Sequence, residues 1–416
     1  MKPSLGWAGW LRLVALGSGY MGIQVVWALY NAYLPNFYGR FIASNTLIGL
    51  IMILDNIAAL TVQPYFGALS DRVQTRFGRR MPFLLVGVPL TAAFLALIPR
   101  ATALVPLLLA TLMMNVGISI YSSPAVALMP DVTPPALRGR ANGLIMLMGG
   151  LGALLAIFVL SPEFERAPVL PFDHAALVLL ASLVIVAVAV PEARLTRPSE
   201  PAPAGDEPAE RGHLLLALRA VATAPDRRAF WLLLAAVAWV AAVNGAQNMF
   251  TRYGTEYLGL SQVRATYMLG YFAGPFILLS IPAGVIGDLL GRLRALRAGS
   301  LGILLAFAAL AAQPPAPVAP WLFALAGVCW ALLMTNAYPI LINLAPAGAA
   351  GTYTGLWNLA IALAGLVSPP LYGAAVDAFG WRAFFPAGVL FLFLGYLCAG
   401  RIAPRPSIAP GHGELL

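Results

Sequence analysis

Twelve long apolar stretches constrain this sequence more than any other feature. A helix that crosses a bilayer needs about 20 apolar residues, and each stretch is roughly that long. Only 10% of the residues are charged and 60% are hydrophobic, whereas soluble domains carry roughly 25% charged residues. The sequence therefore predicts an all-α membrane protein with twelve transmembrane helices. These helices are expected at residues 11–34, 45–69, 81–99, 103–128, 140–160, 172–190, 229–253, 263–287, 295–313, 317–343, 351–375 and 382–401.

The basic residues follow this predicted topology. With the N-terminus in the cytoplasm, 19 of the 25 Lys and Arg residues fall on the cytoplasmic side, which is the bias that membrane proteins show. The net charge of +9 is explained by this bias, so we expect no nucleic-acid partner. We predict a monomer that crosses the cell membrane many times, surrounded by lipid, with both termini in the cytoplasm. The basic residues expected outside are Arg40, Arg100, Arg166, Arg252, Arg264 and Arg382.

A polar segment rich in proline separates six predicted helices from six. It lies within residues 191–228, which we interpret as a cytoplasmic linker in which residues 213–223 form a short helix on the membrane face. The predicted six-helix halves are residues 1–190 and 229–402, followed by a cytoplasmic tail at 403–416. Cys329 and Cys398 fall inside predicted helices and are expected to pack there, so we expect no metal site and no cofactor.

The two halves resemble each other in sequence. Gly67-Ala-Leu-Ser-Asp71 closes the second predicted helix, and Gly284-Val-Ile-Gly-Asp288 closes the eighth. At a constant offset of 212 residues, Asp131 and Gly143 match Asn343 and Gly355. Such repeats predict two parallel six-helix halves related by a pseudo-twofold axis, with the substrate site between them.

The loop after the second helix carries a candidate gate. Its glycine permits close helix contact, and its carboxylate can pair with a basic group in one conformation and release it in the other. The alternative is a static anchor that only fixes topology. The predicted gating residues are Asp71, Arg72, Arg76, Arg79, Arg80, Asp288 and Arg292.

The region 19–90 narrows the family. Gln24 and Trp27 lie in the first helix, Gln63-Pro64 lies in the second, and the loop reads Ser70-Asp71-Arg72 followed by Thr75-Arg-Phe-Gly-Arg-Arg-Met-Pro-Phe83. These motifs resemble the major facilitator superfamily and, within it, the sucrose–proton symporters; the wider glycoside–pentoside–hexuronide cation symporters share a similar region. The resemblance implies a major facilitator fold and sugar transport.

Two positions depart from these families. The resemblance places the coupling aspartate of plant sucrose symporters at Asn115, and the carboxylates of melibiose-type sodium carriers at Ala59 and Gln63. Neither familiar coupling acid is therefore present at its usual position.

Asp55 is the remaining candidate for proton coupling. It lies in the middle of the second predicted helix, whereas none of the three histidines lies near the middle of a predicted helix. A charged Asp at the centre of a membrane helix costs about 2.5–3.5 kcal/mol on insertion scales, so it should face the bundle interior. The alternative role is a structural hydrogen bond between helices.

Amide and aromatic side chains gather on the predicted helices that would line a central cavity. Amides both donate and accept hydrogen bonds, which suits sugar hydroxyls, and aromatic rings can stack on a pyranose. Each amide alone could equally join two helices. The predicted substrate-binding residues are Tyr20, Gln24, Trp27, Asn31, Asn115, Asn244, Gln247, Asn248, Asn336, Tyr338, Trp357 and Asn358.

The sequence thus predicts a secondary transporter of an uncharged sugar or glycoside, with a disaccharide preferred, coupled to a proton and working by alternating access. Two alternatives stay open: a proton-driven exporter of lipophilic cations, with Asp55 as counter-ion, and an uncoupled sugar facilitator. An enzyme embedded in the membrane would need paired acids, a metal cluster or a phosphate-binding loop, and the sequence offers none.

Overall fold

The computed structural model describes residues 7–134, 137–195, 218–224, 226–346 and 348–402. Within them, twelve helices are long and apolar enough to cross a membrane. Each predicted helix coincides with one of these spans, so the prediction of an all-α protein with twelve spans is confirmed.

The first six spans are built from the elements α1 to α7. The second span is divided into α2 and α3, and the fifth continues from α6 through a π-helix and a 3-10 turn. The elements are α1 (Trp7–Gly39), α2 (Asn45–Met52), α3 (Leu54–Arg72), α4 (Met81–Leu97), η1 (Ile98–Arg100), α5 (Leu104–Val132), α6 (Arg138–Leu155), η3 (Ala156–Leu160), η4 (Ser161–Glu165), α7 (Leu170–Ala189) and the short α8 (Glu192–Leu195).

The last six spans are formed by single helices. They are α10 (Arg228–Glu256), α11 (Gln262–Leu290), α12 (Arg292–Ala311), α13 (Ala319–Leu344), α14 (Ala350–Phe379) and α15 (Phe384–Gly400), the last preceded by η5 (Trp381–Ala383). Residues 196–217 of the predicted linker and the tail from 403 lie outside the described residues, whereas residues 218–223 are helical. The linker boundaries and the pseudo-twofold axis stay predictions.

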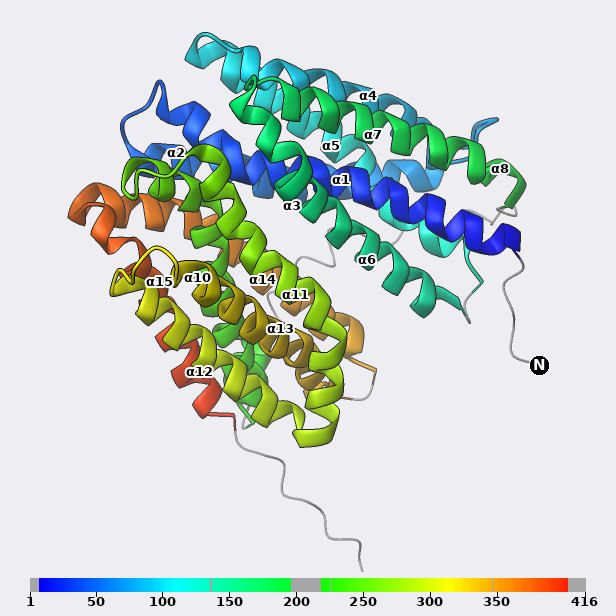
Figure 1. Cartoon of the computed structure of the whole chain (residues 1–416). Helices are drawn as coiled ribbons and strands as arrows, with labels where there is room; N and C mark the ends of the chain where they lie inside the picture. The colour runs from blue at the N-terminus through cyan, green and yellow to red at the C-terminus, as the bar shows by residue number, and fades with distance from the viewer. Residues whose placement is uncertain (1–6, 135–136, 196–217, 225, 347, 403–416) are drawn as a thin grey trace, which may run out of the picture.

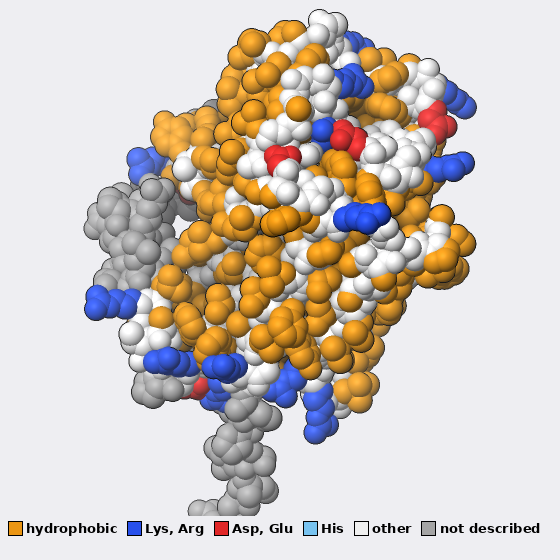
Figure 2. All heavy atoms as spheres, turned by 90° about the vertical axis from the view of Figure 1, so that its left-hand side faces the viewer, with side chains coloured by type: hydrophobic (Ala, Val, Ile, Leu, Met, Phe, Trp, Pro, Cys, Tyr) orange, Lys and Arg blue, Asp and Glu red, His pale blue; other side chains and the backbone are white. Residues whose placement is uncertain are grey.

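The helices pack as two groups. In the first group α1 packs on α6 and α7, and α5 packs on α3 and α4. In the second group α10 packs on α14 and α15, and α13 packs on α11 and α12. Because lipid surrounds a membrane protein, large hydrophobic side chains remain exposed on the outer helices, and Figure 2 shows them over most of the visible face.

The two groups form a V (Figure 1). They meet where α1 leads into α2, and there α2 packs on α14 and α1 packs on α10. They diverge toward the opposite end, where α1 begins, α3 ends and α14 begins. We call the end where the groups meet the joined end, and the opposite end the open end. The two groups of helices therefore lie further apart at the open end than at the joined end.

Asp377 holds the joined end together. This carboxylate lies at the last turn of α14 and accepts five hydrogen bonds from the first residues of α2. Two donors are the backbone N–H groups of Asn45 and Thr46, both 2.9 Å away. The side chains of Ser44, Asn45 and Thr46 supply the other three, at 2.7–2.9 Å. A negative charge is favourable at a helix N-terminus, so the second half caps a helix of the first half.

Arg252 extends this contact from α10. Its Nε donates to Oδ1 of Asn45 at 2.7 Å, and its Nη2 pairs with Glu256 at 2.9 Å. The helices approach closely here because Gly49 and Gly373 lack side chains. A Cβ atom at Gly373 would lie 2.3 Å from the backbone oxygen of Asn45, and one at Gly49 would lie 2.4 Å from that of Pro369. The joined end is thus held together by close packing and by hydrogen bonds to a charged group.

We expect Asp377→Asn to loosen the joined end. An amide replaces one acceptor oxygen with a donor, and hydrogen bonds to charged groups contribute about 1.5–3 kcal/mol each. The population with an open joined end should rise about tenfold or more. Distances between spin labels at Leu47 and Leu371, in a background with both cysteines replaced, would report it.

Asp173→Asn is the matched control, because Asp173 pairs at the same end with Arg100 of its own half, at 2.7 Å. It should leave the distance distribution unchanged. An equal effect of both substitutions would contradict the role of Asp377.

Candidate substrate and coupling site

Asp55 lies directly after the break in the second span. The turn at Ile53 separates α2 from α3, and Asp55 occupies the first turn of α3. Its Oδ1 accepts the backbone N–H of Asn56 at 2.6 Å and the amide Nδ2 of the same residue at 2.9 Å. The first N–H groups of a helix have no partner within the helix, so the carboxylate satisfies one of them. The break thus provides the Asp55 carboxylate, inside the span, with hydrogen-bond donors from the adjacent residue Asn56.

Tyr30 of α1 is a buried polar residue of the first half that lies near both Asp55 and Asn115 of α5. Tyr30 is 1% exposed and Asn115 is 4% exposed. Among the described residues, the Tyr30 hydroxyl and the Asn115 Oδ1 have no hydrogen-bond partner. Buried polar atoms nearly always have a partner, so these two groups can pair with each other or with water.

Asn56 connects Asp55 to the second half. A Cβ atom at Gly365 of α14 would lie 2.9 Å from its Oδ1. The Asn56 amide, which donates to Asp55, therefore also packs against α14, the helix that carries Asp377 in its last turn. Nothing in the local sequence marked Asn56, because its neighbour lies more than 300 residues away.

The four predicted residues of α1 are half-buried. Tyr20 and Gln24 lie against α6, where a Cβ atom at Gly149 would meet them at 2.5 and 3.2 Å. The Trp27 ring meets that of Tyr30 edge-on, with centroids 5.3 Å apart. Trp27 is thereby connected to the surroundings of Asp55.

Three predicted residues of α10 lie on one stretch of the helix. Asn248 donates to the backbone oxygen and to Oδ1 of Asn244, both at 2.9 Å, and Ser368 of α14 donates to the same Oδ1 at 3.3 Å. Gln247 lines a small apolar cavity of about 20 Å³ inside the second half. These amides are therefore partly engaged in helix contacts.

Tyr338 and Trp357 form a pair between α13 and α14, with ring centroids 5.8 Å apart. The hydroxyl of Tyr338 also lies 2.9 Å from that of Thr354. Asn358 is exposed and lies two turns before Gly365 on the same face of α14. Asn358 therefore lies on the face of α14 that meets the first half at Gly365.

Asn336 occupies a different place from the one predicted. It is 1% exposed, and its Nδ2 donates to the backbone oxygens of Leu332 and Ala283 at 2.8 and 3.2 Å. Gly287 leaves room for its amide between α13 and α11. The structure thus gives Asn336 the alternative role that the sequence left open, which is joining two helices.

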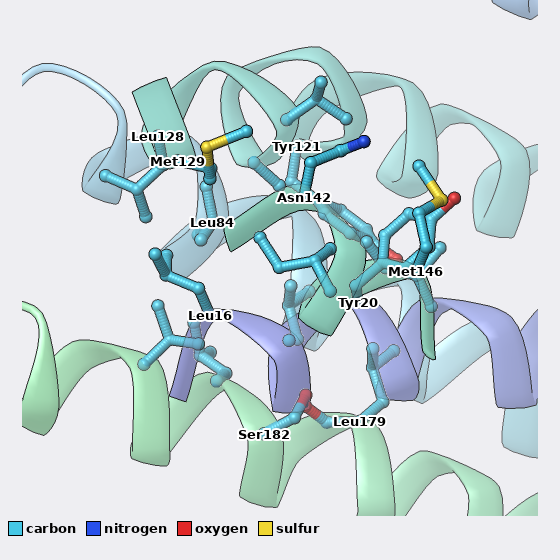
Figure 3. Close-up of a pocket in the computed structure, with 18 residues that line it drawn as sticks. Leu16, Tyr20, Leu84, Tyr121, Leu128, Met129, Asn142, Met146, Leu179 and Ser182 are labelled. Atoms are coloured by element: carbon cyan, nitrogen blue, oxygen red, sulfur yellow. The ribbon is translucent and has the colours of Figure 1, made fainter. Parts of the chain in front are cut away.

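The cavity in Figure 3 lies inside the first half, between α1, α4, α5, α6 and α7. Tyr20, Asn142 and Ser182 are polar residues of a mostly apolar lining. Its volume of about 120 Å³ is below the 300–1,000 Å³ typical of ligand sites. This cavity is therefore small for a disaccharide.

The predicted gating residues of the first half lie at the open end. Arg80 forms ion pairs with Asp71 and with Asp131, the latter at 3.0 Å, and Arg79 contacts Asp131 at 2.7 Å. Glu192 accepts the backbone N–H groups of Arg79, Arg80 and Met81 at 2.9 Å each and so caps α4. The sequence alone gives Asp131 and Glu192 no gating signal, although Asp131 belongs to the repeat.

The other gating residues are more exposed. Arg72 and Arg76 are exposed, and the Arg76 guanidinium lies over the Phe77 ring at 4.7 Å. In the second half Asp288 and Arg292 pair at 2.8 Å, one helical turn apart. Each of these ion pairs and ring contacts joins residues of the same half, as expected where the two halves lie apart.

Comparisons with known proteins agree with this architecture. A bacterial homologue of the human lysosomal transporter Spinster, solved in an inward-facing and unoccupied conformation, matches with a TM-score of 0.73 over 96% of this chain and 98% of that chain. The sequences are 16% identical, so the likeness concerns the fold alone.

Curated relatives match over shorter stretches. The sucrose transport protein SUC3 of Arabidopsis thaliana is 26% identical over 156 residues, which are 32% of this chain and 26% of that protein. The human proton-associated sugar transporter A is 25% identical over 213 residues, 45% of this chain and 28% of that protein. The matched regions thus span only about a quarter of these relatives.

The predicted resemblance to sucrose–proton symporters is confirmed by these matches. The family model described as Major Facilitator Superfamily matches residues 16–369 and 272–414. This coverage of most of the chain shows that the protein is a multi-pass membrane protein of the Major Facilitator Superfamily.

Proposed function

We propose that the protein moves an uncharged sugar or glycoside, with a disaccharide preferred, together with a proton. The sugar is supported by the names of the relatives and by the amide and aromatic side chains on α1, α10, α13 and α14. The proton is supported by one observation above all. Asp55 lies at a helix break, beside the unpaired polar atoms of Tyr30 and Asn115, and is hydrogen-bonded to a residue that touches the other half.

The arginines at the open end support its assignment to the cytoplasm. In this arrangement the gap between the halves faces inward, and the Asp377 contact closes the outer side. Alternating access then requires the joined end to separate while Asp71 and its neighbours gain partners across the gap. One chain contains both halves, so we propose that the monomer is the working unit.

Asn56 offers a route from the proton to this movement. When Asp55 is ionised, its Oδ1 accepts both donors of Asn56. Protonation weakens an acceptor that is strong because it is charged, and the amide is then freer to leave Gly365. The carboxylate would thus influence how α3 packs against α14.

Counterflow in proteoliposomes with a panel of radiolabelled sugars tests the proposal. We expect exchange of a disaccharide and its accumulation when a pH gradient is imposed. Exchange that ignores the gradient would support the uncoupled facilitator instead. Absence of exchange for every sugar would reject sugar transport and leave the exporter of lipophilic cations to be tested.

We expect Asp55→Asn to abolish accumulation and preserve counterflow, because the neutral amide resembles the protonated acid. The double variant Asp55→Asn, Asn115→Asp returns a carboxylate to the surroundings of Tyr30 and should regain part of the accumulation. The single variant Asn115→Asp is its control. Accumulation that survives Asp55→Asn would reject the coupling role of Asp55.

We expect Trp27→Ala to weaken sugar binding by about tenfold, since an aromatic contact contributes about 0.5–1.5 kcal/mol beyond its buried area. Trp10→Ala is the matched control on the same helix, because Trp10 is 43% exposed near the open end. Equilibrium binding of the sugar found by counterflow would measure both. Equal affinities for Trp27→Ala and the wild type would exclude stacking by Trp27.

A further inference from the structure

At the open end, the surroundings of the arginines differ between the two halves. In the first half, Asp131 pairs with Arg79 and Arg80, and Glu192 caps the N-terminus of α4. Both the side chains and the first backbone N–H groups of that turn therefore have carboxylate partners.

The second half keeps the arginines and lacks both acids. In the repeat, Asn343 occupies the position of Asp131. The chain after α15 reads Arg401-Ile-Ala-Pro-Arg-Pro406, with no carboxylate where Glu192 follows α7. The turns correspond, since Gly78 and Gly291 both have positive φ, at 113° and 94°. However, α12 begins at Arg292, and no side chain of the described residues caps it.

A pocket of about 510 Å³ lies where these acids are missing. Among the described residues, the carboxylates that pair with its arginines are Asp226, with Arg228, and Asp288, with Arg292. Its floor is apolar and its basic groups come from α10 and α12. The lining includes Arg228, Arg292, Arg294, Arg297, Asn343 and Leu344.

Arg297 is held in place on one side only. Its Nη2 donates to the backbone oxygen of Ile402 at 2.7 Å. Its Nε is buried and has no partner among the described residues. The pocket therefore combines surplus positive charge, an unpaired buried donor and an uncapped helix N-terminus.

We propose that this pocket binds a phosphate group, and that a phospholipid headgroup at the membrane surface supplies it. Arginine forks match phosphate oxygens, and helix N-termini attract anions. The phosphate takes the place of the two carboxylates that the first half provides. The apolar floor suits a molecule with an acyl chain. This site is separate from the proposed sugar path.

The unfolding temperature of the purified full chain in detergent tests the site, with three probes. Short-chain phosphatidylglycerol should raise it by a few degrees, and short-chain phosphatidylcholine should raise it less. Inorganic phosphate should have little effect at equal concentration. A rise with inorganic phosphate equal to that with phosphatidylglycerol would overturn the lipid source. No rise with any probe would overturn the site.

Two variants make the test specific. Arg294→Gln should weaken the effect of phosphatidylglycerol about tenfold in concentration, the loss of one charge-assisted contact. Asn343→Asp restores the acid of the first half, so it should stabilise the protein without lipid and abolish the lipid effect. Arg264→Gln, at the joined end, is the matched control and should keep the full effect. An unchanged lipid effect in both pocket variants would show that the arginines only mark topology.

Discussion

One carboxylate accepts five of the hydrogen bonds that join the two halves. Asp377 ends a helix of the second half and caps a helix of the first, and Arg252 braces the same residues from α10. An acid at the C-terminal turn of α14 is disfavoured by that helix's own dipole. The unfavourable position becomes favourable only because α2 begins beside it. This contact supports the V shape of the molecule together with a second contact between the halves, in which Ser261 at the N-terminus of α11 donates to Glu165 of η4 at 3.2 Å.

The contact at Asp377 also bears on access to the space between the halves. In the proposed function, a substrate would reach the space between the halves from the open end. The second span carries both the contact with Asp377, at the start of α2, and the ionisable Asp55, in α3. A change at Asp55 is therefore only a few residues from the helix that makes this contact.

The sequence predicted the spans well and the contacts between them poorly. Apolar length places each span to within a few residues, because the bilayer sets that length. The break at Ile53 follows no proline or glycine at that position, so no local signal announced it. Asn336 and Asp377 show why site residues were harder: their partners, Gly287 and Asn45, are fixed only by tertiary packing. Asp55 was recognisable because a carboxylate in a membrane helix is costly wherever its partners lie.

The break at Ile53 also sets the depth of the proposed proton site. With its 8 residues, α2 is about 12 Å long, so Asp55 lies near the middle of a hydrocarbon core of about 30 Å. A proton that binds there has crossed about half of the electric field. A full crossing corresponds to about 2.3 kcal/mol per 100 mV, so each half-crossing corresponds to about 1 kcal/mol. Membrane voltage would then act on proton binding and on proton release to similar extents, and the cell could drive this carrier electrically as well as by pH.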